Sequence, residues 1–372
     1  MLASIVSFRL GGPDGVSVQA ATWGKALERL GYDLRRVAGD LADGARPGDV
    51  VVPGLAVAAE AAPGPAGQRP AAPDGPAPEE LAAALAGSDV VVVENMLSLP
   101  LHLEAARVLT AVLAGLPASV RVLLHHHDFA WQRAETAAIT ELPPRLPRAV
   151  HITINDFSRR ELAARGIEAV TVRNAFDLDA RPGRRAEARV ALGLVEADRP
   201  LLVLQPTRAI ARKNIPAALR LCEALAARVD RPVVYWLPGP AEDGFAATLA
   251  GIVAGATVPV IRAGWGDLGL TMADAYAACD LVVFPSTGGE GFGQPVIESV
   301  WADRPLAVLR YPALDEILEL GFSFLRADDP ERVAAALRNP DTATGTRNRE
   351  LAERHFSMSA LERALGSLLP AS

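Results

Sequence analysis

The amino-acid sequence predicts an α/β protein with two doubly wound, Rossmann-like domains. Short runs rich in valine, leucine and isoleucine alternate with alanine- and leucine-rich segments of helical period. The apolar runs lack polar alternation, which is typical of strands in a parallel sheet that is covered on both faces. The length of 372 residues exceeds what one hydrophobic core usually organises, so two domains are expected.

The elements can be assigned in chain order. The strands expected after the opening one are the apolar runs at 88–95, 119–127, 149–155, 199–208, 231–239 and 279–286. Clear helical patterns follow the opening strand, at 16–31, and the strand at 199–208, at 215–229.

Two stretches without an apolar period interrupt this alternation. A polar stretch with proline and glycine predicts a domain boundary near residues 177 to 182, hence a first domain over 1–178 and a second over 179–355. Another stretch, at 61–78, predicts a mobile surface loop within the first domain.

Composition and charge exclude several classes of function. The formal net charge of -7 argues against a nucleic-acid partner held by phosphate neutralisation. Cys222 and Cys279 lie in apolar segments and predict buried free thiols in a reducing compartment. No segment approaches the ~20 apolar residues that a membrane helix requires. We therefore expect a cytoplasmic protein, and peripheral contact with a membrane stays open.

The first chemically suggestive loop follows the opening strand. Gly11, Gly12 and Gly15 precede a helical pattern, an arrangement that lets backbone N–H groups approach a phosphate at a helix N-terminus. The loop does not match G-x-G-x-x-G, and Asp40 is a weak acidic candidate, so a nicotinamide site fits poorly. A tight turn without a ligand is the alternative.

A basic loop follows the strand at 199–208. In "PTRAIARKN", Arg208 and Lys213 stand five positions apart between that strand and a helix. Arginine offers a planar fork to phosphate oxygens and lysine a mobile point charge, so the pair suits a diphosphate. The alternative is a solvated basic turn, with Arg212 also pointing into water.

The stretch "EGFGQPVIE" combines features that suit a sugar nucleotide. Gly291 and Gly293 allow a close backbone approach, and Pro295 favours the start of a helix. Glu290 precedes that helix and Glu298 lies about one turn into it, so two carboxylates can accept hydrogen bonds from hydroxyl groups. The N-terminus of the helix would face an anion.

A run of histidines ends the strand at 119–127. On an extended segment His125 and His127 share one side and His126 points to the other. His125 and His127 could bind zinc, but no third ligand with metal spacing follows, so we expect no metal site. His127 is the expected site residue, whereas His125 and His126 are expected to be satisfied by packing and hydrogen bonds.

Three further polar residues are candidates for the pocket of an acceptor substrate. Asp128 directly follows the histidines, while Glu94 and Asn95 end the strand at 88–95. A helix cap is the alternative role for Glu94 and Asn95.

The ordered motifs resemble a known family, the retaining nucleotide-sugar glycosyltransferases of the GT-B fold called "glycosyl transferases group 1". The motifs are "GGPDGVSVQ", the His-Asp of "LLHHHDF", "VRNAFD" before the linker, "PTRAIARKN" as Arg-x4-Lys and "EGFGQPVIE" as Glu-x7-Glu. The segment "HFSMSALERALGSLL" resembles the last helix of that fold, so residues 356–372 are expected to pack back on the first domain.

The resemblance implies a role for each matching residue of the second domain, which would hold the donor. Arg208 and Lys213 would bind the diphosphate, Glu298 the ribose hydroxyls and Glu290 the transferred sugar. The backbone of Gly291, Phe292 and Gly293 would contact the sugar and the distal phosphate.

The first domain would hold the acceptor. His127 would lie near the donor sugar, with Glu94, Asn95 and Asp128 as candidates for acceptor contacts. The loop at Gly11 and Gly12 would close over the diphosphate. His127, Glu290, Lys213 and Arg208 form the expected catalytic set.

The implied reaction moves a hexosyl group from a nucleotide-diphosphate sugar, of the GDP-mannose or UDP-glucose type, to an acceptor hydroxyl with retention of configuration. No cofactor and no metal are expected. The acceptor could be a small molecule, a glycan or a lipid-linked sugar. Two other functions stay open, a GT-B-like sugar-nucleotide epimerase and a non-catalytic sugar-nucleotide sensor.

One departure from the family pattern predicts a backbone conformation. The segment "SVWADRPLAV" has no glycine before its proline, where the family usually has one. Asp303 or Arg304 is therefore expected to adopt the turn conformation that glycine takes elsewhere.

Overall fold

The computed structural model describes residues 1–12, 14–57, 74–133, 136–177, 183–194, 199–242 and 244–369. The chain divides into two compact units. Unit 1 comprises Met1–Ala175 together with Ser357–Ser372, and unit 2 comprises Phe176–Phe356. Most of the loop expected at 61–78, and most of the boundary expected at 177 to 182, lie outside the described residues.

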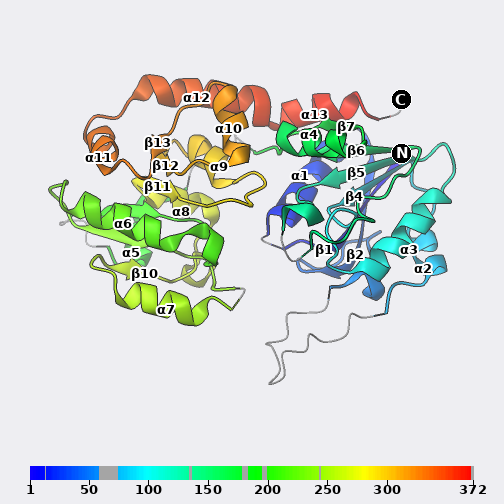
Figure 1. The fold of residues 1–372 in the computed structure, drawn as a ribbon, viewed down its shortest axis with the longest axis horizontal. Helices are drawn as coiled ribbons and strands as arrows, with labels where there is room; N and C mark the ends of the chain where they lie inside the picture. Colours follow the sequence, from blue (N-terminus) through cyan, green and yellow to red (C-terminus); the bar gives the residue numbers. More distant parts are fainter. Residues whose placement is uncertain are drawn as a thin grey trace. The chain divides into compact units, whose positions relative to one another are not determined.

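In unit 1 most strands are followed by a helix along the chain (Figure 1). Its described elements are β1 (Leu2–Leu10), α1 (Gly15–Arg29), β2 (Asp33–Leu41), β3 (Val50–Val51), α2 (Pro78–Ala84), β4 (Val90–Glu94), α3 (Leu103–Ala114), β5 (Arg121–His126), β6 (Ala149–Thr153), α4 (Asp156–Ala164), β7 (Ala169–Thr171) and α13 (Met358–Gly366). The described strands form one parallel sheet in the order β3-β2-β1-β4-β5-β6-β7.

Both faces of this sheet are covered, as β4 illustrates. Val90 and Val92 join a core that includes residues of α1 and α13, whereas Val91 and Val93 join a core that includes residues of α2 and α3. Successive side chains of a strand point to opposite faces, so an unbroken valine run is what a doubly covered sheet requires.

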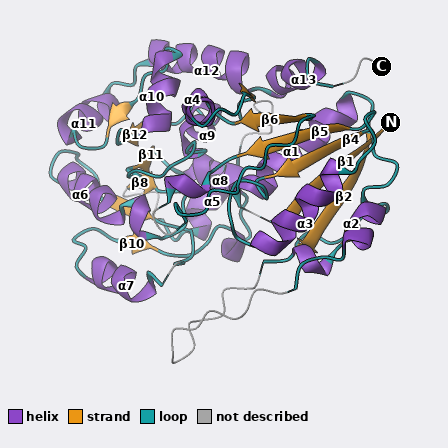
Figure 2. Ribbon diagram, turned by 45° about the vertical axis from the view of Figure 1, so that its right-hand side comes forward, coloured by secondary structure: helices purple, strands orange, loops and turns teal. Residues whose placement is uncertain are grey.

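Unit 2 repeats the architecture. Its described elements are α5 (Arg185–Ala191), β8 (Leu201–Leu204), α6 (Ile215–Ala226), β9 (Val233–Trp236), α7 (Ala246–Ala254), β10 (Val260–Ile261), α8 (Met272–Ala278), β11 (Leu281–Phe284), α9 (Pro295–Trp301), β12 (Leu306–Val308), α10 (Pro312–Glu319), β13 (Leu325–Arg326), α11 (Pro330–Arg338) and α12 (Thr342–Phe356). Its parallel sheet has the order β10-β9-β8-β11-β12-β13. Figure 2 shows helices around the strands of each unit.

The α/β class with two doubly wound domains is thus confirmed. Strand order reverses between β1 and β4 in unit 1, and between β8 and β11 in unit 2. In open parallel sheets, ligands bind beyond the carboxyl ends of the strands at such switch points. The loops after β8 and β11 are those that carry Lys213 and Glu290.

Two details of the sequence reasoning are also confirmed. Cys222 and Cys279 are buried free thiols. Asp303 has a φ of 53°, so it adopts the left-handed conformation that glycine would otherwise take before the β12 strand. Among the described helices, none is long and apolar enough to cross a membrane.

Candidate functional site

A buried ion pair joins the two switch-point loops of unit 2. Lys213 ends the short 3-10 helix η4 (Ala211–Lys213) that follows β8, and Glu290 lies in the loop after β11. The Lys213 Nζ contacts Glu290 Oε2, and the two side chains are only 9% and 10% exposed. Burial at this level is unusual for charged groups, which stay inside only when they are paired.

Two more groups donate to the same oxygen. Arg212 Nη1 lies 2.7 Å and Ser286 Oγ 2.8 Å from Glu290 Oε2. Although burial raises the pKa of Glu290, Lys213 and Arg212 outweigh it and hold that pKa below its usual value. The carboxylate is therefore ionised, and it holds two cations together beside the ends of β8 and β11.

Arg208 lies apart from this cluster. Its Nη1 pairs with Glu242 Oε2 at 2.5 Å, and the two side chains are 46% and 33% exposed. An ion pair this exposed contributes little to stability and can exchange partners readily. The arrangement leaves Arg208 able to turn to an anionic ligand.

The glycine turn before α9 is fixed by close packing. Gly293 has a φ of 82°, and a Cβ built there would lie 2.2 Å from Tyr311 Oη. Tyr311 donates its hydroxyl to the Phe292 carbonyl at 2.8 Å. The Phe292 ring packs beside Phe176 and Phe356, so this side chain anchors the turn and only its backbone suits a ligand contact.

The helix after the turn begins at Pro295, but α9 has only seven residues. A helix this short has a small dipole, so the positive charge beside the turn comes mainly from Lys213 and Arg212. The expected contribution of the helix end to anion binding is correspondingly reduced.

Glu298 lies in α9 and is paired with a tyrosine that the sequence reasoning missed. Tyr276, in α8, donates its hydroxyl to Glu298 Oε2 at 2.6 Å. Burial raises the pKa of Glu298 to about 7, and the Tyr276 hydrogen bond opposes that rise only in part. The carboxyl group is thus balanced between its two protonation states near neutral pH.

A second cluster lies in unit 1, at the ends of β4 and β5. Glu94 Oε2 lies 2.9 Å from His125 Nδ1 and 3.0 Å from His127 Nε2. Glu94 and His125 are register partners in the parallel sheet, and both are fully buried. As expected, His126 points to the other side, where its Nε2 lies 3.0 Å from His151 Nδ1.

Asn95 and Asp128 flank this cluster. Asn95 has a φ of 56°, and its Oδ1 accepts the backbone N–H groups of His127 at 2.9 Å and Asp128 at 3.2 Å. Asn95 therefore organises the loop after β5. The Asp128 carboxylate pairs with Arg133 at 3.2 Å.

The fold places a possible third metal ligand beside His125 and His127. This residue is Glu94, and one ligand atom from each of the three lies within 4.8 Å of the others. Neighbouring strands of a parallel sheet end at the same edge, which spacing along the chain does not reveal. The absence of a metal stays a prediction.

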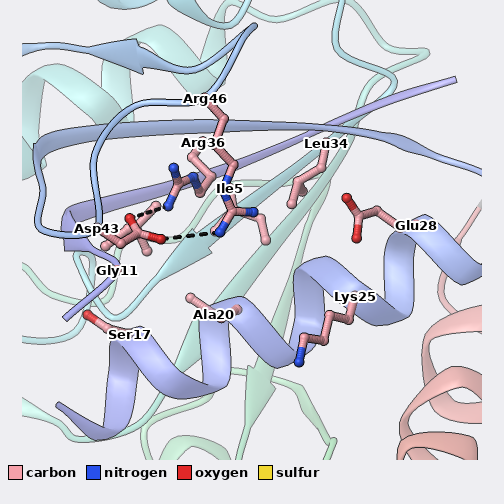
Figure 3. Close-up of a pocket in the computed structure, with 12 residues that line it drawn as sticks. Ile5, Gly11, Ser17, Ala20, Lys25, Glu28, Leu34, Arg36, Asp43 and Arg46 are labelled. Atoms are coloured by element: carbon pink, nitrogen blue, oxygen red, sulfur yellow. Dashed lines mark hydrogen bonds and ion pairs between the residues drawn. The ribbon is translucent and has the colours of Figure 1, made fainter. Parts of the chain in front are cut away.

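The loop at Gly11 is tightly held within unit 1. Gly11 has a φ of 77°, and a Cβ there would lie 2.0 Å from Asp43 Oδ1. Figure 3 shows Asp43 beside the guanidinium groups of Arg36 and Arg46, which pair with it at 2.6 and 3.2 Å and line a small cavity of about 80 Å³ with Gly11.

The helix end beside this loop already carries a carboxylate. Asp14 caps α1, and its Oδ1 accepts the Ser17 N–H at 3.1 Å. This carboxylate already accepts one of the backbone N–H groups that a bound phosphate would use. Contact of Gly11 and Gly12 with a diphosphate stays a prediction.

Comparisons with known proteins place this architecture in a class. The structure is similar over 99% of both chains to Anabaena HepE, solved with UDP and glucose, with a TM-score of 0.68 and 16% identity. It is also similar over the full length of both chains to WaaG, a glycosyltransferase involved in lipopolysaccharide biosynthesis, with a TM-score of 0.65 and 13% identity. The fold is that of the GT-B glycosyltransferases.

Sequence comparison adds a similarity to one family over part of the chain. Residues 206–339 match the model of the family described as "Glycosyl transferases group 1". The chain is also 25% identical over 329 residues to the mannosylglucosylglycerate synthase of Thermotoga maritima, covering 75% of each protein. The enzyme of the same name from Petrotoga mobilis is 25% identical over 274 residues, or 63% of this chain and 62% of that protein. The predicted resemblance to group 1 glycosyltransferases is thus confirmed over residues 206–339, and its retaining, Glu-x7-Glu character stays a prediction.

Proposed function

We propose that the protein is a metal-independent, retaining hexosyltransferase that takes its donor from a nucleotide-diphosphate sugar. The observation that carries this proposal is the buried cluster of Lys213, Arg212 and Glu290 at the switch point of unit 2. It lies within the part of the chain that matches the glycosyltransferase family. Two cations held by one carboxylate suit a diphosphate on one side and a sugar hydroxyl on the other.

In this proposal the cations exchange partners when the donor binds. Lys213 and Arg208 contact the diphosphate, and Arg212 adds a third positive group that the sequence reasoning left in solvent. Glu290 then accepts a hydrogen bond from the transferred sugar, while Glu298, oriented by Tyr276, accepts from the ribose. In unit 1, His127 and Asp128 contact the substrates.

The reaction follows from where the positive charge gathers. The bond between the anomeric carbon and the diphosphate oxygen breaks, and Lys213, Arg212 and Arg208 stabilise the charge that develops on the leaving group. The acceptor hydroxyl forms the new bond on the same face and gives its proton to the departing phosphate oxygen. Retention needs no separate base and no metal in this scheme.

The donor is a GDP-mannose or UDP-glucose type of compound. The name of the two relatives contains a mannosyl group, which favours a mannosyl donor, and it contains a glucosylglycerate, which favours a small glycoside acceptor. Solved neighbours contain UDP and UDP-glucose, which favours the uridine nucleotide. A lipid-linked or glycan acceptor, membrane contact and a cytoplasmic location stay predictions.

Incubation with a nucleotide sugar and no acceptor tests the proposal. UDP-glucose and GDP-mannose are each supplied, and the products are followed by NMR. Slow release of free hexose and nucleoside diphosphate is the expected result. An epimerised nucleotide sugar would favour the epimerase instead, and unchanged donor despite tight binding would favour a sensor.

Donor affinity is expected to rise with pH because of Glu298. Only its ionised carboxylate can accept from both ribose hydroxyls, and its pKa of about 7 leaves it mostly protonated at pH 6. Between pH 6 and pH 8 the ionised fraction grows by roughly tenfold, so the dissociation constant of the intact nucleotide sugar should fall by up to about that factor. Calorimetry across this range measures it.

The matched variant is Glu298→Gln, which keeps the size of the side chain and does not titrate. It should bind the donor more weakly than the wild type at pH 8, with no pH dependence between 6 and 8. A wild-type affinity that is flat over this range would exclude Glu298 from the ribose contact. Nucleotide sugars are the appropriate probes, since their diphosphate has no group that titrates near pH 7.

A further inference from the structure

Glu94 is the one carboxylate that both His125 and His127 contact in the described part of unit 1. His125 Nδ1 lies 3.0 and 2.9 Å from the two Glu94 oxygens, and His127 Nε2 lies 3.0 Å from Oε2. All three residues are buried, with Glu94 and His125 at 0% and His127 at 6% exposure. The carboxylate is thus shared between two imidazoles in a buried environment.

The protonation of the cluster follows from the carboxylate. Burial raises the pKa of Glu94, but the two imidazoles outweigh that effect and lower it to about 2. An ionised carboxylate has no proton to donate, so both imidazoles must donate to it. His125 therefore carries a proton on Nδ1, and His127 carries one on Nε2.

The second nitrogens of the two rings differ. His125 Nε2 is buried without a partner, and its ring stacks on Trp23 with centroids 4.1 Å apart. Burial lowers the pKa of His125, so this nitrogen holds a lone pair. His127 Nδ1 has no hydrogen-bond partner among the described residues either, but the His127 side chain keeps 7% of its surface exposed whereas that of His125 keeps none.

The loop around His127 is fixed as well. Asn95 Oδ1 accepts the backbone N–H groups of His127 and Asp128, and Ser98 Oγ lies 2.9 Å from the same oxygen. Asn95 thus holds the backbone at His127, and Glu94 holds the Nε2 side of its imidazole. Such orientation by outer hydrogen bonds is how proteins select one histidine tautomer.

We propose that Glu94 is a positioning residue that holds His127 in the Nε2-protonated tautomer and so presents Nδ1 as a hydrogen-bond acceptor for a substrate hydroxyl. This inference rests on the proposed transferase function for the identity of the ligand. The tautomer itself does not depend on that function. Glu94 is then neither an acceptor contact nor a helix cap, the two roles that the sequence left open for it.

A metal ion on the same three groups is the competing arrangement. The nitrogen-to-oxygen distances of 2.9 to 3.0 Å are those of direct hydrogen bonds. Histidines that bind metals almost always donate their second ring nitrogen to a partner, and His125 Nε2 has none among the described residues. The hydrogen-bonded arrangement therefore explains the cluster better.

Nitrogen-15 NMR of the full-length protein at pH 8 tests the tautomer directly. Long-range proton-nitrogen correlations distinguish the two neutral forms of histidine, and His127→Gln assigns the signal. The wild type is expected to show His127 protonated on Nε2, and Glu94→Gln to populate the Nδ1-protonated form. A wild-type His127 in the Nδ1-protonated or doubly protonated form would overturn the proposal, as would loss of the Nε2 proton on addition of equimolar Zn²⁺.

Kinetics then tests the role. Glu94→Gln should lower kcat for donor hydrolysis by about 10- to 100-fold and leave the KM of the nucleotide sugar within about twofold. His151→Asn is the matched control. It removes the imidazole that lies beside His126, whose side chain points to the opposite face of β5 from His125 and His127. Equal losses in both variants would show that Glu94 acts only through packing.

The two proposals fail in different ways. A wild-type protein that hydrolyses neither donor would contradict the transferase function and leave the tautomer measurement intact. Donor hydrolysis that is unaffected by Glu94→Gln, in a folded variant with an altered His127 tautomer, would contradict the positioning role alone.

Discussion

Lys213→Ala is expected to cause the largest loss of nucleotide binding of any single substitution in unit 2. The change removes a buried charge that contacts Glu290 and, in the proposed complex, the diphosphate. A charge-assisted hydrogen bond of this kind contributes roughly 1.5–3 kcal/mol, which corresponds to about a 10- to 150-fold weaker affinity. Calorimetry with UDP and GDP measures the effect.

The chain offers a matched control, since Lys25 is its only other lysine. Lys25 lies in α1 of unit 1, so Lys25→Ala should leave nucleotide affinity unchanged. Arg208→Ala should also weaken nucleotide binding. In the proposed complex Arg208 leaves Glu242, its exposed ion-pair partner, and contacts the diphosphate. Unchanged nucleotide affinity in a Lys213→Ala variant, shown to be folded by thermal melting, would mean that Lys213 does not contact the diphosphate.

Glu290→Gln is expected to separate catalysis from nucleotide binding. The substitution keeps the shape of the side chain and removes the charge that Lys213 and Arg212 share. Free UDP or GDP should bind at least as well as before, because the two cations lose a competitor. Turnover of the intact donor should fall on the order of 100-fold, because the transferred sugar loses a group that positions it.

Steady-state and binding measurements on the same preparation distinguish these effects. Arg310→Gln is a suitable control, since it removes one member of an exposed ion pair with Asp315 elsewhere in unit 2. If Glu290→Gln weakens UDP binding as much as Lys213→Ala does, Glu290 belongs to the nucleotide contact and the division of roles is wrong.

The fold could be predicted because the strands are visible as local runs of apolar residues. A run such as Val90 to Val93 fits a strand with two buried faces, and most such runs are followed by a segment of helical period. The Glu290 and Glu298 pair was also visible, because the loop and the helix that carry them are adjacent in sequence. Local patterns therefore gave both the sheets and the main motif.

The partners of these residues could not be predicted, because they depend on strand order. Arg212 meets Glu290 across 78 positions because β8 lies beside β11, and Glu94 meets His125 because β4 lies beside β5. Tyr276 gives no signal of its own, since a tyrosine in an alanine-rich helix reads as core. Glu94 was the one such partner that could have been found, since it and His125 end consecutive strands.

The measurement that tests the central claim most directly is the configuration of the sugar released from the donor. The wild-type protein is incubated with an α-linked nucleotide sugar and EDTA, without an acceptor, and proton NMR follows the first hexose that appears before it equilibrates in water. Retention by the cationic cluster predicts the α anomer at an undiminished rate. Initial release of the β anomer would contradict retention, and a rate abolished by EDTA would contradict catalysis without a metal.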